Sequence, residues 1–544
     1  MQPGGRSGAM RLNTLGRFLL LILPFLVATG YRFDSDRLLG YHHFRQAHTA
    51  MTARNFAFHE PNILRPTIDG VTYGKNLYLN EFPLYPYVLG QLWRAFGERL
   101  WIGRSLSVFF MVLALWFFYR LLRHFIEDRW IPDLALLVLG ITPVISYFAR
   151  SLQRQSLFLF ALVAGIFFVV RHLDERRWWD LCLGAVALAV AILLNPFAVY
   201  IALPLAWYGL KTDGRRLFMR WMLYPAAAIA VLPAAAWYLH VLEASKNLPT
   251  GSIVALTADY NNRDLLSLQR YAMWLDLGNW ASFYRNFVRF VVPFVASFAI
   301  FAYGVIKAPA EKGYAFFRYW LLAVLVYFLF DFYPIAVVVH QYYYVNIAPL
   351  TALFLAYGLI HGGRVLARTW ITGFEVVDKQ RSEITLRIHY PGKVLALLLL
   401  FVLATPPLFV YGAYRYSRRM INDDWHEWYY DVRTELSEFV GPNDRLSIVA
   451  DSDDPLFSFV AAPHLKHRLV MYDPGRLERL LEFGDFEYLA LVYDQPGFPL
   501  DEILAKIENA GYLDGPVLRA ENILLFRTDS ALHGVEIGLG RMGR

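Results

Sequence analysis

Acidic, basic and imidazole side chains gather between residues 31 and 104, in a hydrophilic stretch that follows the first apolar run of the chain. The stretch contains Asp34-Ser-Asp36, HHFRQAHTAMTARNF at 42–56 and NEFPLYPYV at 80–88. Carboxylates can accept protons or hold divalent cations, and arginine forks match phosphate oxygens. Apolar runs dominate the next several hundred residues. We therefore expect the 31–104 loop to hold the chemistry and the apolar runs to hold the loop.

Glu81 is the strongest catalytic candidate in this loop. Proline and aromatic residues follow it, where the chain is expected to return to an apolar surface. An ionisable group at that depth is costly unless it is paired or functional. Its carboxylate could take a proton from an acceptor hydroxyl, or hold a metal ion that does so. The alternative is a structural ion pair with a nearby Arg or Lys.

Two other groups in the loop are weaker candidates. Asp34 and Asp36 could coordinate a divalent ion bound to phosphate oxygens, but polar loops often contain such pairs, so a solvated or structural role is favoured. His42, His43 and His48 are spaced i, i+1 and i+6, which places no two of them one helical turn apart and disfavours zinc. His43 is the one for which we keep a functional role.

The composition indicates a polytopic α-helical membrane protein. The chain has 544 residues, 57% hydrophobic and 18% charged, whereas a soluble protein would carry about 25% charged residues. We count about eleven apolar spans of the length needed to cross a bilayer. They lie near 15–31, 101–119, 131–148, 156–171, 181–194, 197–210, 221–240, 287–306, 319–335, 342–360 and 393–414, and 181–210 could be one hairpin broken at Asn195-Pro196.

The loop charges give this topology a direction. Lys and Arg recur at 120–129, 171–177, 211–216, 307–318 and 362–393, which the positive-inside rule places in the cytoplasm. This pattern accounts for the net charge of +7 better than nucleic acid binding does. An odd number of spans then puts the 31–104 loop, the 241–286 loop, His340 and the C-terminal region on the outer face.

Basic residues predicted at the outer face are not explained by topology, so some should bind an anion. They are Arg45, Arg54, Lys75, Arg104, Arg150 and Arg154. Together they favour a lipid phosphate, although each alone could be a surface charge. His340 and Tyr343 belong to HQYYYVNIAPL at 340–350, where they could ligate metal, bind phosphate or contact sugar, or form an aromatic belt at the membrane interface.

The composition changes near residue 421. Strand-like segments at 445–451, 467–473, 487–494 and 522–529 alternate with helical ones at 425–440, 476–483 and 500–510. This pattern predicts a small outer α/β domain over 421–544, after a transmembrane domain over 1–420. It contains no Gly-rich phosphate loop, so the fold alone assigns it no function.

Two segments of the loop and one late segment resemble the GT-C superfamily of polyprenyl-phosphate-sugar glycosyltransferases, over roughly residues 15–360. HFRQAHTAMTARNF is similar to the first-loop helix of that superfamily, written W-R-Q-x-D-T-A-x-x-A-R-N in one branch. NEFPLYPYVLGQLWRAFG is similar to the acid-Pro-Leu-Tyr segment that follows, and HQYYYVNIAP to a His-x-Tyr-Tyr segment. The nearest members are related to protein mannosyltransferases, aminoarabinose transferases and lipopolysaccharide galacturonosyltransferases.

The resemblance implies transfer of a sugar from a lipid-phosphate carrier on the outer face of a bacterial inner membrane. It implies that Glu81 is the acid of the second segment, that Arg45 and Gln46 are the Arg-Gln pair, and that His340 is the late histidine. Three acidic positions of the relatives are absent, where this chain has Arg45, His48 and Arg154-Gln155.

The sequence thus predicts a GT-C glycosyltransferase acting on a glycolipid, polysaccharide or protein hydroxyl. Glu81 would be the base or, with His340, a ligand of a divalent metal, and Arg45, Lys75 and Arg150 would bind the donor phosphate. The alternatives are a transporter or flippase for lipid-linked sugars, or a non-catalytic assembly subunit. A transporter predicts charged residues within spans and repeated halves, whereas the spans look nearly free of acids apart from Asp331 and no repeat is visible.

Overall fold

The chain forms two compact units in the computed structural model. The first contains Met1–Asp34, Gly103–Leu239 and Asn261–Asn422, and the second contains Ser35–Ile102, His240–Tyr260 and Asp423–Arg544. The structure describes residues 13–35, 37–38, 40, 42–68, 76–247, 253–254, 272–332, 335–336, 340–372, 374–376, 386–388, 392–421, 446–450, 468–471, 488–492, 499–509, 518–520 and 523–527.

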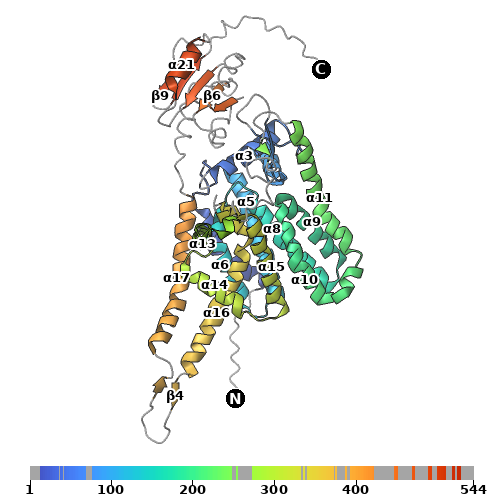
Figure 1. Ribbon diagram of the computed structural model, residues 1–544, viewed down its shortest axis with the longest axis vertical. Helices are drawn as coiled ribbons and strands as arrows, with labels where there is room; N and C mark the ends of the chain where they lie inside the picture. The colour runs from blue at the N-terminus through green and yellow to red at the C-terminus, as the bar shows by residue number, and fades with distance from the viewer. Residues whose placement is uncertain are drawn as a thin grey trace, which may run out of the picture. The chain divides into compact units, whose positions relative to one another are not determined.

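Apolar helices make up most of the first unit (Figure 1). Its α-helices are α1 (Thr14–Leu21), α2 (Leu23–Gly30), α5 (Leu100–Phe125), α6 (Trp130–Ile141), α7 (Pro143–Phe148), α8 (Gln155–Glu175), α9 (Trp178–Leu194), α10 (Ala202–Asp213), α11 (Leu223–Ala244), α13 (Leu277–Phe290), α14 (Val295–Lys307), α15 (Lys312–Phe330), α16 (Ala348–Thr372) and α17 (Gly392–Ile421). Short 3-10 helices are η1 (Pro196–Ile201), η2 (Gly214–Met219), η5 (Met273–Leu275) and η7 (Gln341–Asn346). A hairpin of β4 (Phe374–Val376) and β5 (Leu386–Ile388) lies between α16 and α17.

The helices confirm a multi-pass membrane protein. By length and composition, 5 helices of the described residues can cross a membrane, or 6 if α13 and α14, bent by 95°, form one broken span. The expected span at 287–306 is therefore not one straight helix. The expected break at Asn195 is present, because Pro196 begins η1 and the Asn195 side chain accepts a hydrogen bond from the Phe197 amide at 3.2 Å. Eleven crossings remain a prediction.

Small residues set the closest helix packing in the first unit. A Cβ on Gly304 of α14 would overlap the Phe354 carbonyl oxygen of α16, and one on Gly358 would overlap the Ile300 carbonyl oxygen. Small residues at helix interfaces allow backbones to approach in a bilayer, where burial from water does not drive association. Glycine at both positions therefore permits the close contact of α14 and α16.

The spans were expected to be nearly free of acids apart from Asp331, and the structure adds two buried acids in the first turns of apolar helices. Asp133 in the first turn of α6 is buried, pairs with Arg17 and accepts a hydrogen bond from the Tyr119 hydroxyl at 3.0 Å. Asp180 in the first turn of α9 is also buried and lies 3.3 Å from Arg171. Both carboxylates have basic partners, as burial of a charge requires.

The second unit contains α3 (His43–Phe58) and α4 (Leu84–Phe96), which pack together, with a small sheet of β1 (Thr67–Ile68), β2 (Asn76–Leu79) and β3 (Ile253–Val254). A short 3-10 helix, η3 (Ser245–Asn247), lies at the end of α11. The segment HFRQAHTAMTARNF, which resembles a first-loop helix, is helical as that likeness implies. Most of its side chains are buried, including those of His48 and Arg54. A Cβ on Gly90 of α4 would lie 2.6 Å from the Ala53 carbonyl oxygen, so glycine there brings α4 close to α3.

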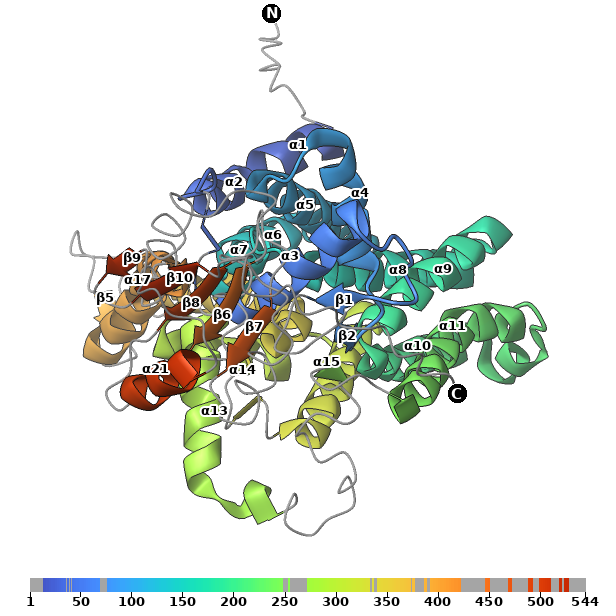
Figure 2. The ribbon, with the colours of Figure 1, turned by 90° about the horizontal axis from the view of Figure 1, so that it is seen from above.

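The C-terminal strands form a sheet of five in the order β7-β6-β8-β10-β9 (Figure 2). β6 runs parallel to β7 and β8, whereas β10 runs antiparallel to β8 and β9. The strands are β6 (Leu446–Ala450), β7 (Arg468–Met471), β8 (Tyr488–Val492), β9 (Leu518–Ala520) and β10 (Ile523–Arg527). Helix α21 (Leu500–Asn509) lies between β8 and β9 along the chain. The four predicted strands and the helix at 500–510 are confirmed. The helices predicted at 425–440 and 476–483 lie outside the described residues, and the domain boundary at 421 stays a prediction.

Candidate active site

Glu81 and Arg45 form an ion pair in the second unit. Arg45 projects from the first turn of α3, and Glu81 lies between the end of β2 and Pro83, which caps α4. Arg45 Nη2 donates to Glu81 Oε2 at 3.1 Å and to Oε1 at 3.4 Å. The two side chains are only 16% and 17% exposed. Glu81 and Arg45, both candidates from the sequence, are therefore in contact, as the alternative of a structural ion pair for Glu81 predicted. The Glu81 carboxylate keeps some access to solvent.

The other side chains of α3 named as candidates are buried. His43 is 6% exposed and Gln46 is 3% exposed. The ring of His48 lies 5.0 Å from that of Tyr78 on β2. The three histidines of this segment are thus part of the packing between α3 and its neighbours in the second unit.

Arg54 was counted among the phosphate-seeking cations, but it has a carboxylate of its own. Its Nε and Nη2 donate to Glu98 oxygens at 2.9 Å and 2.7 Å, and its side chain is 6% exposed. Two parallel bonds of this kind are the strong geometry for a guanidinium and a carboxylate. Arg54 and Glu98 therefore stabilise the second unit. Sequence reasoning missed Glu98, although the acid directly before α5 was a visible signal.

Three arginines of the first unit form a second basic cluster, at the end of α2 and between α7 and α8. Arg150 Nη2 donates to the Arg32 carbonyl at 2.7 Å, and Arg104 Nη1 donates to the Phe33 carbonyl at 2.7 Å. Arg104 is 2% exposed and Arg150 is 4% exposed. Arg32 has a φ of 51°, which turns the chain out of α2 so that two successive carbonyls meet the two guanidinium groups. Sequence reasoning named Arg104 and Arg150 but missed Arg32.

The surroundings of Arg150 disfavour its positive charge. Burial, then the nearby Arg104 and Arg32 guanidinium groups, lowers the pKa of Arg150 to about 10. Arg150 Nη1 is buried with no hydrogen-bond partner. A buried donor without an acceptor costs free energy, and an anion there would supply both the acceptor and the opposite charge.

Arg154 and Asp34 have different surroundings. Arg154 donates to the Leu194 carbonyl, which ties the start of α8 to the end of α9. Asp34 is exposed, and the described part of the chain offers it no hydrogen bond or ion pair, which agrees with a solvated role. Asp36 and Lys75 lie outside the described residues.

His340 and Tyr343 belong to an aromatic group at η7 of the first unit. The His340 ring stacks on Tyr342 with centroids 5.1 Å apart, and Tyr342 lies 4.7 Å from Tyr343. Tyr343 also approaches Tyr327 of α15, at 6.2 Å. His340 and Tyr343 are half-buried. The histidine thus extends a platform of rings, a surface suited to packing against an apolar face of a ligand.

The first unit contains an apolar cavity of about 550 Å³. Its walls come from α2, the end of α6 and α17, and include Leu23, Val27, Ile141, Val410 and Tyr414. It reaches Tyr31, whose ring is covered by the guanidinium of Arg418 at 3.5 Å. Tyr31 directly precedes Arg32. The pattern of the sequence gave no sign of this cavity, because its walls are ordinary apolar residues of separate spans.

The chain is similar to known membrane glycosyltransferases in part of its sequence and in its fold. The model of the dolichyl-phosphate-mannose-protein mannosyltransferase family matches residues 80–240. Among solved structures, ArnT from Cupriavidus metallidurans bound to undecaprenyl phosphate is 17% identical, with a TM-score of 0.60, over 96% of this chain and 100% of that one. Its apo form is 16% identical, with a TM-score of 0.59, over 96% and 99%. The chain has the GT-C glycosyltransferase fold.

The GT-C likeness extends to a more distant structure. The oligosaccharyltransferase AglB from Archaeoglobus fulgidus, solved with an inhibitory peptide and a dolichol-phosphate, is 12% identical, with a TM-score of 0.50, over 87% of this chain and 69% of that one. The sequence comparison with curated proteins gave no match. The resemblance inferred from the three segments is thus confirmed, at the level of the fold.

The described residues of this chain show no set of ligands for a metal ion. Among the described residues, no three His, Cys, Asp or Glu side chains come together as a metal site requires. Glu81 has an arginine partner, and His340 packs on tyrosine rings. The described residues therefore give no support to the metal-binding role predicted for Glu81 and His340.

Proposed function

We propose that the chain is a membrane glycosyltransferase that moves a sugar from a polyprenyl-phosphate carrier to a hydroxyl of a glycolipid, polysaccharide or protein at the outer face. The observation that carries the proposal is the buried Arg150, whose Nη1 has no hydrogen-bond partner and which lies near the Arg104 and Arg32 guanidinium groups, in a chain with the GT-C fold. ArnT, which shares this fold, has been solved bound to undecaprenyl phosphate.

Arg150 and Arg104 are the proposed donor-phosphate residues. A phosphodiester carries one negative charge on oxygens that accept from guanidinium groups. Arg150 Nη1 has an unused donor, and a charge-assisted hydrogen bond to it is worth about 1.5–3 kcal/mol. The anion would also offset the repulsion of Arg150 by the neighbouring Arg104 and Arg32 guanidinium groups.

The apolar cavity next to Tyr31 is the proposed site for the prenyl chain. Its walls are aliphatic and aromatic, and its polar border includes Arg418 and Ser417. Burying prenyl methyl and methylene groups there would contribute about 0.8 kcal/mol for each group removed from water. Helix α3 is mostly buried and offers little free surface for that purpose.

Glu81 is the proposed general base. Its carboxylate, held by Arg45, would take the proton of the acceptor hydroxyl. The acceptor oxygen forms a bond to the anomeric carbon, and the bond from that carbon to the phosphate oxygen breaks. The electron pair leaves with polyprenyl phosphate, whose new charge the arginine cluster stabilises. His340, Tyr342 and Tyr343 offer rings for the sugar.

The test uses Glu81→Gln in membranes supplied with a radiolabelled polyprenyl-phosphate sugar. We expect label transfer to fall by about a hundredfold or more, as removal of a general base does, while undecaprenyl phosphate still binds. Arg45→Lys is the companion variant, since it keeps the charge beside Glu81 but not the fork. Retained sugar transfer by the Glu81→Gln variant would exclude Glu81 as the general base. Lipid movement across the membrane without transfer in the wild type would favour the transporter.

A further inference from the structure

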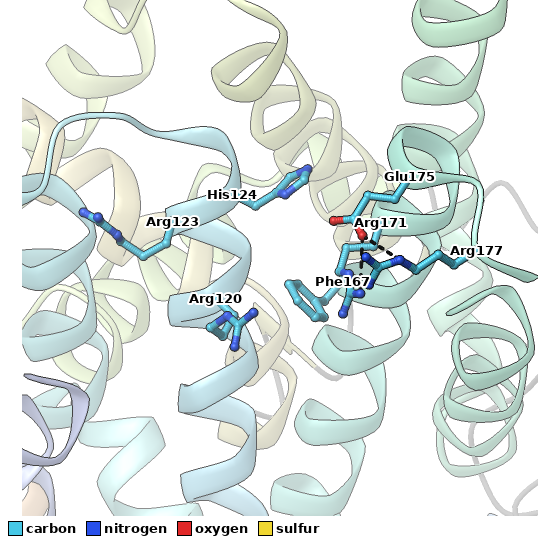
Figure 3. Close-up of a pocket in the computed structure, with 7 residues that line it drawn as sticks. All are labelled: Arg120, Arg123, His124, Phe167, Arg171, Glu175 and Arg177. Atoms are coloured by element: carbon cyan, nitrogen blue, oxygen red, sulfur yellow. Dashed lines mark hydrogen bonds and ion pairs between the residues drawn. The ribbon is translucent and has the colours of Figure 1, made fainter. Parts of the chain in front are cut away.

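A second basic site surrounds a cavity of about 410 Å³ between the end of α5 and the end of α8 (Figure 3). Its charged lining consists of Arg120, Arg123, His124, Arg171, Glu175 and Arg177. Four arginines against one glutamate leave a clear positive excess. None of these residues takes part in the proposed transfer reaction, so the cavity needs an explanation of its own.

Helical spacing brings these side chains to one groove. On α5, Arg120 and His124 are one turn apart, and on α8, Phe167, Arg171 and Glu175 follow at successive turns. Figure 3 shows Arg120 on the side of α5 that faces Phe167, whereas Arg123 extends from the opposite side. Arg120 and Arg171 therefore bracket the cavity from its two helices.

Two of the four arginines lack an acidic partner. Glu175 lies 3.5 Å from Arg171 and 3.2 Å from Arg177, and these pairs account for its charge. Arg120 lies over aromatic rings, 5.5 Å from the Trp116 centroid and 5.6 Å from the Phe167 centroid. Within the described chain, neither Arg120 nor Arg123 pairs with a carboxylate. The Arg120 guanidinium can therefore bind an anion in the cavity without breaking an ion pair, and Arg123 adds an uncompensated positive charge on the same helix.

The same two helices continue the cavity with an apolar strip. Phe117 of α5 packs against Phe160 and Phe167 of α8, with centroids 5.9 Å and 5.6 Å apart, and Phe110 stacks on Phe160 at 5.8 Å. Phe110, Phe117 and Phe160 are half-exposed. A charged groove that leads into a half-exposed strip of rings along membrane helices suits a headgroup with attached acyl chains.

Exposed tryptophans place the site near the membrane surface. Trp130 is 53% exposed at the start of α6, and Trp178 and Trp179 are 65% and 52% exposed at the start of α9, directly after Arg177. Tryptophan is enriched at the level of lipid headgroups. The basic loops 120–129 and 171–177 are those that the positive-inside rule assigns to the cytoplasm, where the membrane surface is anionic.

We propose that this cavity binds the headgroup phosphate of an anionic phospholipid from the cytoplasmic leaflet. Arg120 donates to the phosphate oxygens, Arg123, Arg171 and Arg177 add positive potential, and the acyl chains lie along the strip of Phe110, Phe117 and Phe160. This site is separate from the arginine cluster at Arg150, and it does not depend on the transfer reaction.

The experiment uses the full chain in detergent, titrated with short-chain phosphatidylglycerol or phosphatidylcholine, with lipid retention followed by native mass spectrometry. Arg120→Gln/Arg123→Gln removes two charges from the cavity and breaks no ion pair. The matched control is Arg215→Gln/Arg216→Gln, which removes two exposed arginines of η2, predicted on the same side and without described carboxylate partners. Undecaprenyl phosphate binding is measured in parallel.

We expect the cavity variant to lose affinity for phosphatidylglycerol on the order of tenfold, and the control to change by less than about twofold. Equal losses in the two variants would overturn the site in favour of general surface charge. Displacement of the lipid by inorganic phosphate as readily as by phosphatidylglycerol would show a free-anion site instead. If the double variant fails to fold, Arg120→Gln alone, at an exposed position that faces Phe167, must still weaken binding relative to Arg215→Gln.

Discussion

We expect Arg150→Gln to lose tight polyprenyl-phosphate binding while the unliganded chain stays at least as stable as the wild type. Arg150 is 4% exposed, and its neighbours Arg104 and Arg32 carry the same charge. Burial and these neighbours lower the pKa of Arg150 from 12.5 to about 10. At roughly 1.4 kcal/mol per pKa unit, this corresponds to about 3 kcal/mol against the charged form in the folded chain.

The two consequences of the substitution therefore have opposite signs. A neutral glutamine avoids the cost of the buried charge, and its amide can still donate to the Arg32 carbonyl. The lost packing and hydrogen bonding would cost about 1–2 kcal/mol, so the free energy of unfolding should stay level or rise slightly. Loss of a charge-assisted bond to phosphate should weaken binding by about tenfold to a hundredfold.

The measurement is thermal unfolding of the purified chain in detergent, with and without undecaprenyl phosphate. Arg54→Gln is the control, because it removes a buried arginine that has a carboxylate partner, Glu98. Leaving that carboxylate without its partner should cost about 3–5 kcal/mol. The reasoning fails if Arg150→Gln binds the lipid like the wild type, or if it loses as much stability as Arg54→Gln.

Four further substitutions test the packing, the cavity and one ion pair. Gly90→Ala should destabilise the chain by about 1–3 kcal/mol because its Cβ would meet the neighbouring helix. Gly363→Ala, with open space around it, should stabilise the helix by about 0.5–1 kcal/mol. The unfolding midpoints of the two variants, compared with that of the wild type, test both predictions. Ala28→Trp should fill part of the apolar cavity, so binding of long-chain prenyl phosphate should weaken more than that of a short-chain analogue in the same titration. Burial raises the pKa of Asp128, but hydrogen bonds from Arg364 and a backbone amide outweigh it and lower the pKa. Because its pKa is lowered in the folded chain, Asp128 stabilises the fold at pH values above its pKa in the unfolded chain. This stabilisation is lost as the pH falls through the pKa of Asp128 in the folded chain. Asp128→Asn should thus cost up to about 1 kcal/mol at neutral pH, and a difference from the wild type that persists unchanged below about pH 3 would contradict the pairing.

The fold class could be predicted because each of its signals is local. An apolar run of bilayer length predicts a membrane helix wherever it lies, and Asn195-Pro196 marks a break whatever surrounds it. The C-terminal strands were found for the same reason, since alternating apolar residues between turns are read within a few positions. The bend between α13 and α14 was not found, because a 95° change of direction depends on how neighbouring helices pack.

For the candidate site, the sequence determined the residue types and only the tertiary structure decided their partners. Arg45, Arg54 and Arg150 look alike as isolated cations. The fold pairs Arg45 with Glu81 and Arg54 with Glu98, but it buries Arg150 beside Arg104, with an unused donor. A partner far along the chain leaves no trace in local spacing, because the free energy of a buried charge depends on everything that surrounds it. The acid in NEFPLYPYV could thus be recognised from the sequence, whereas the unused donor of the buried Arg150 could be recognised only from the folded chain.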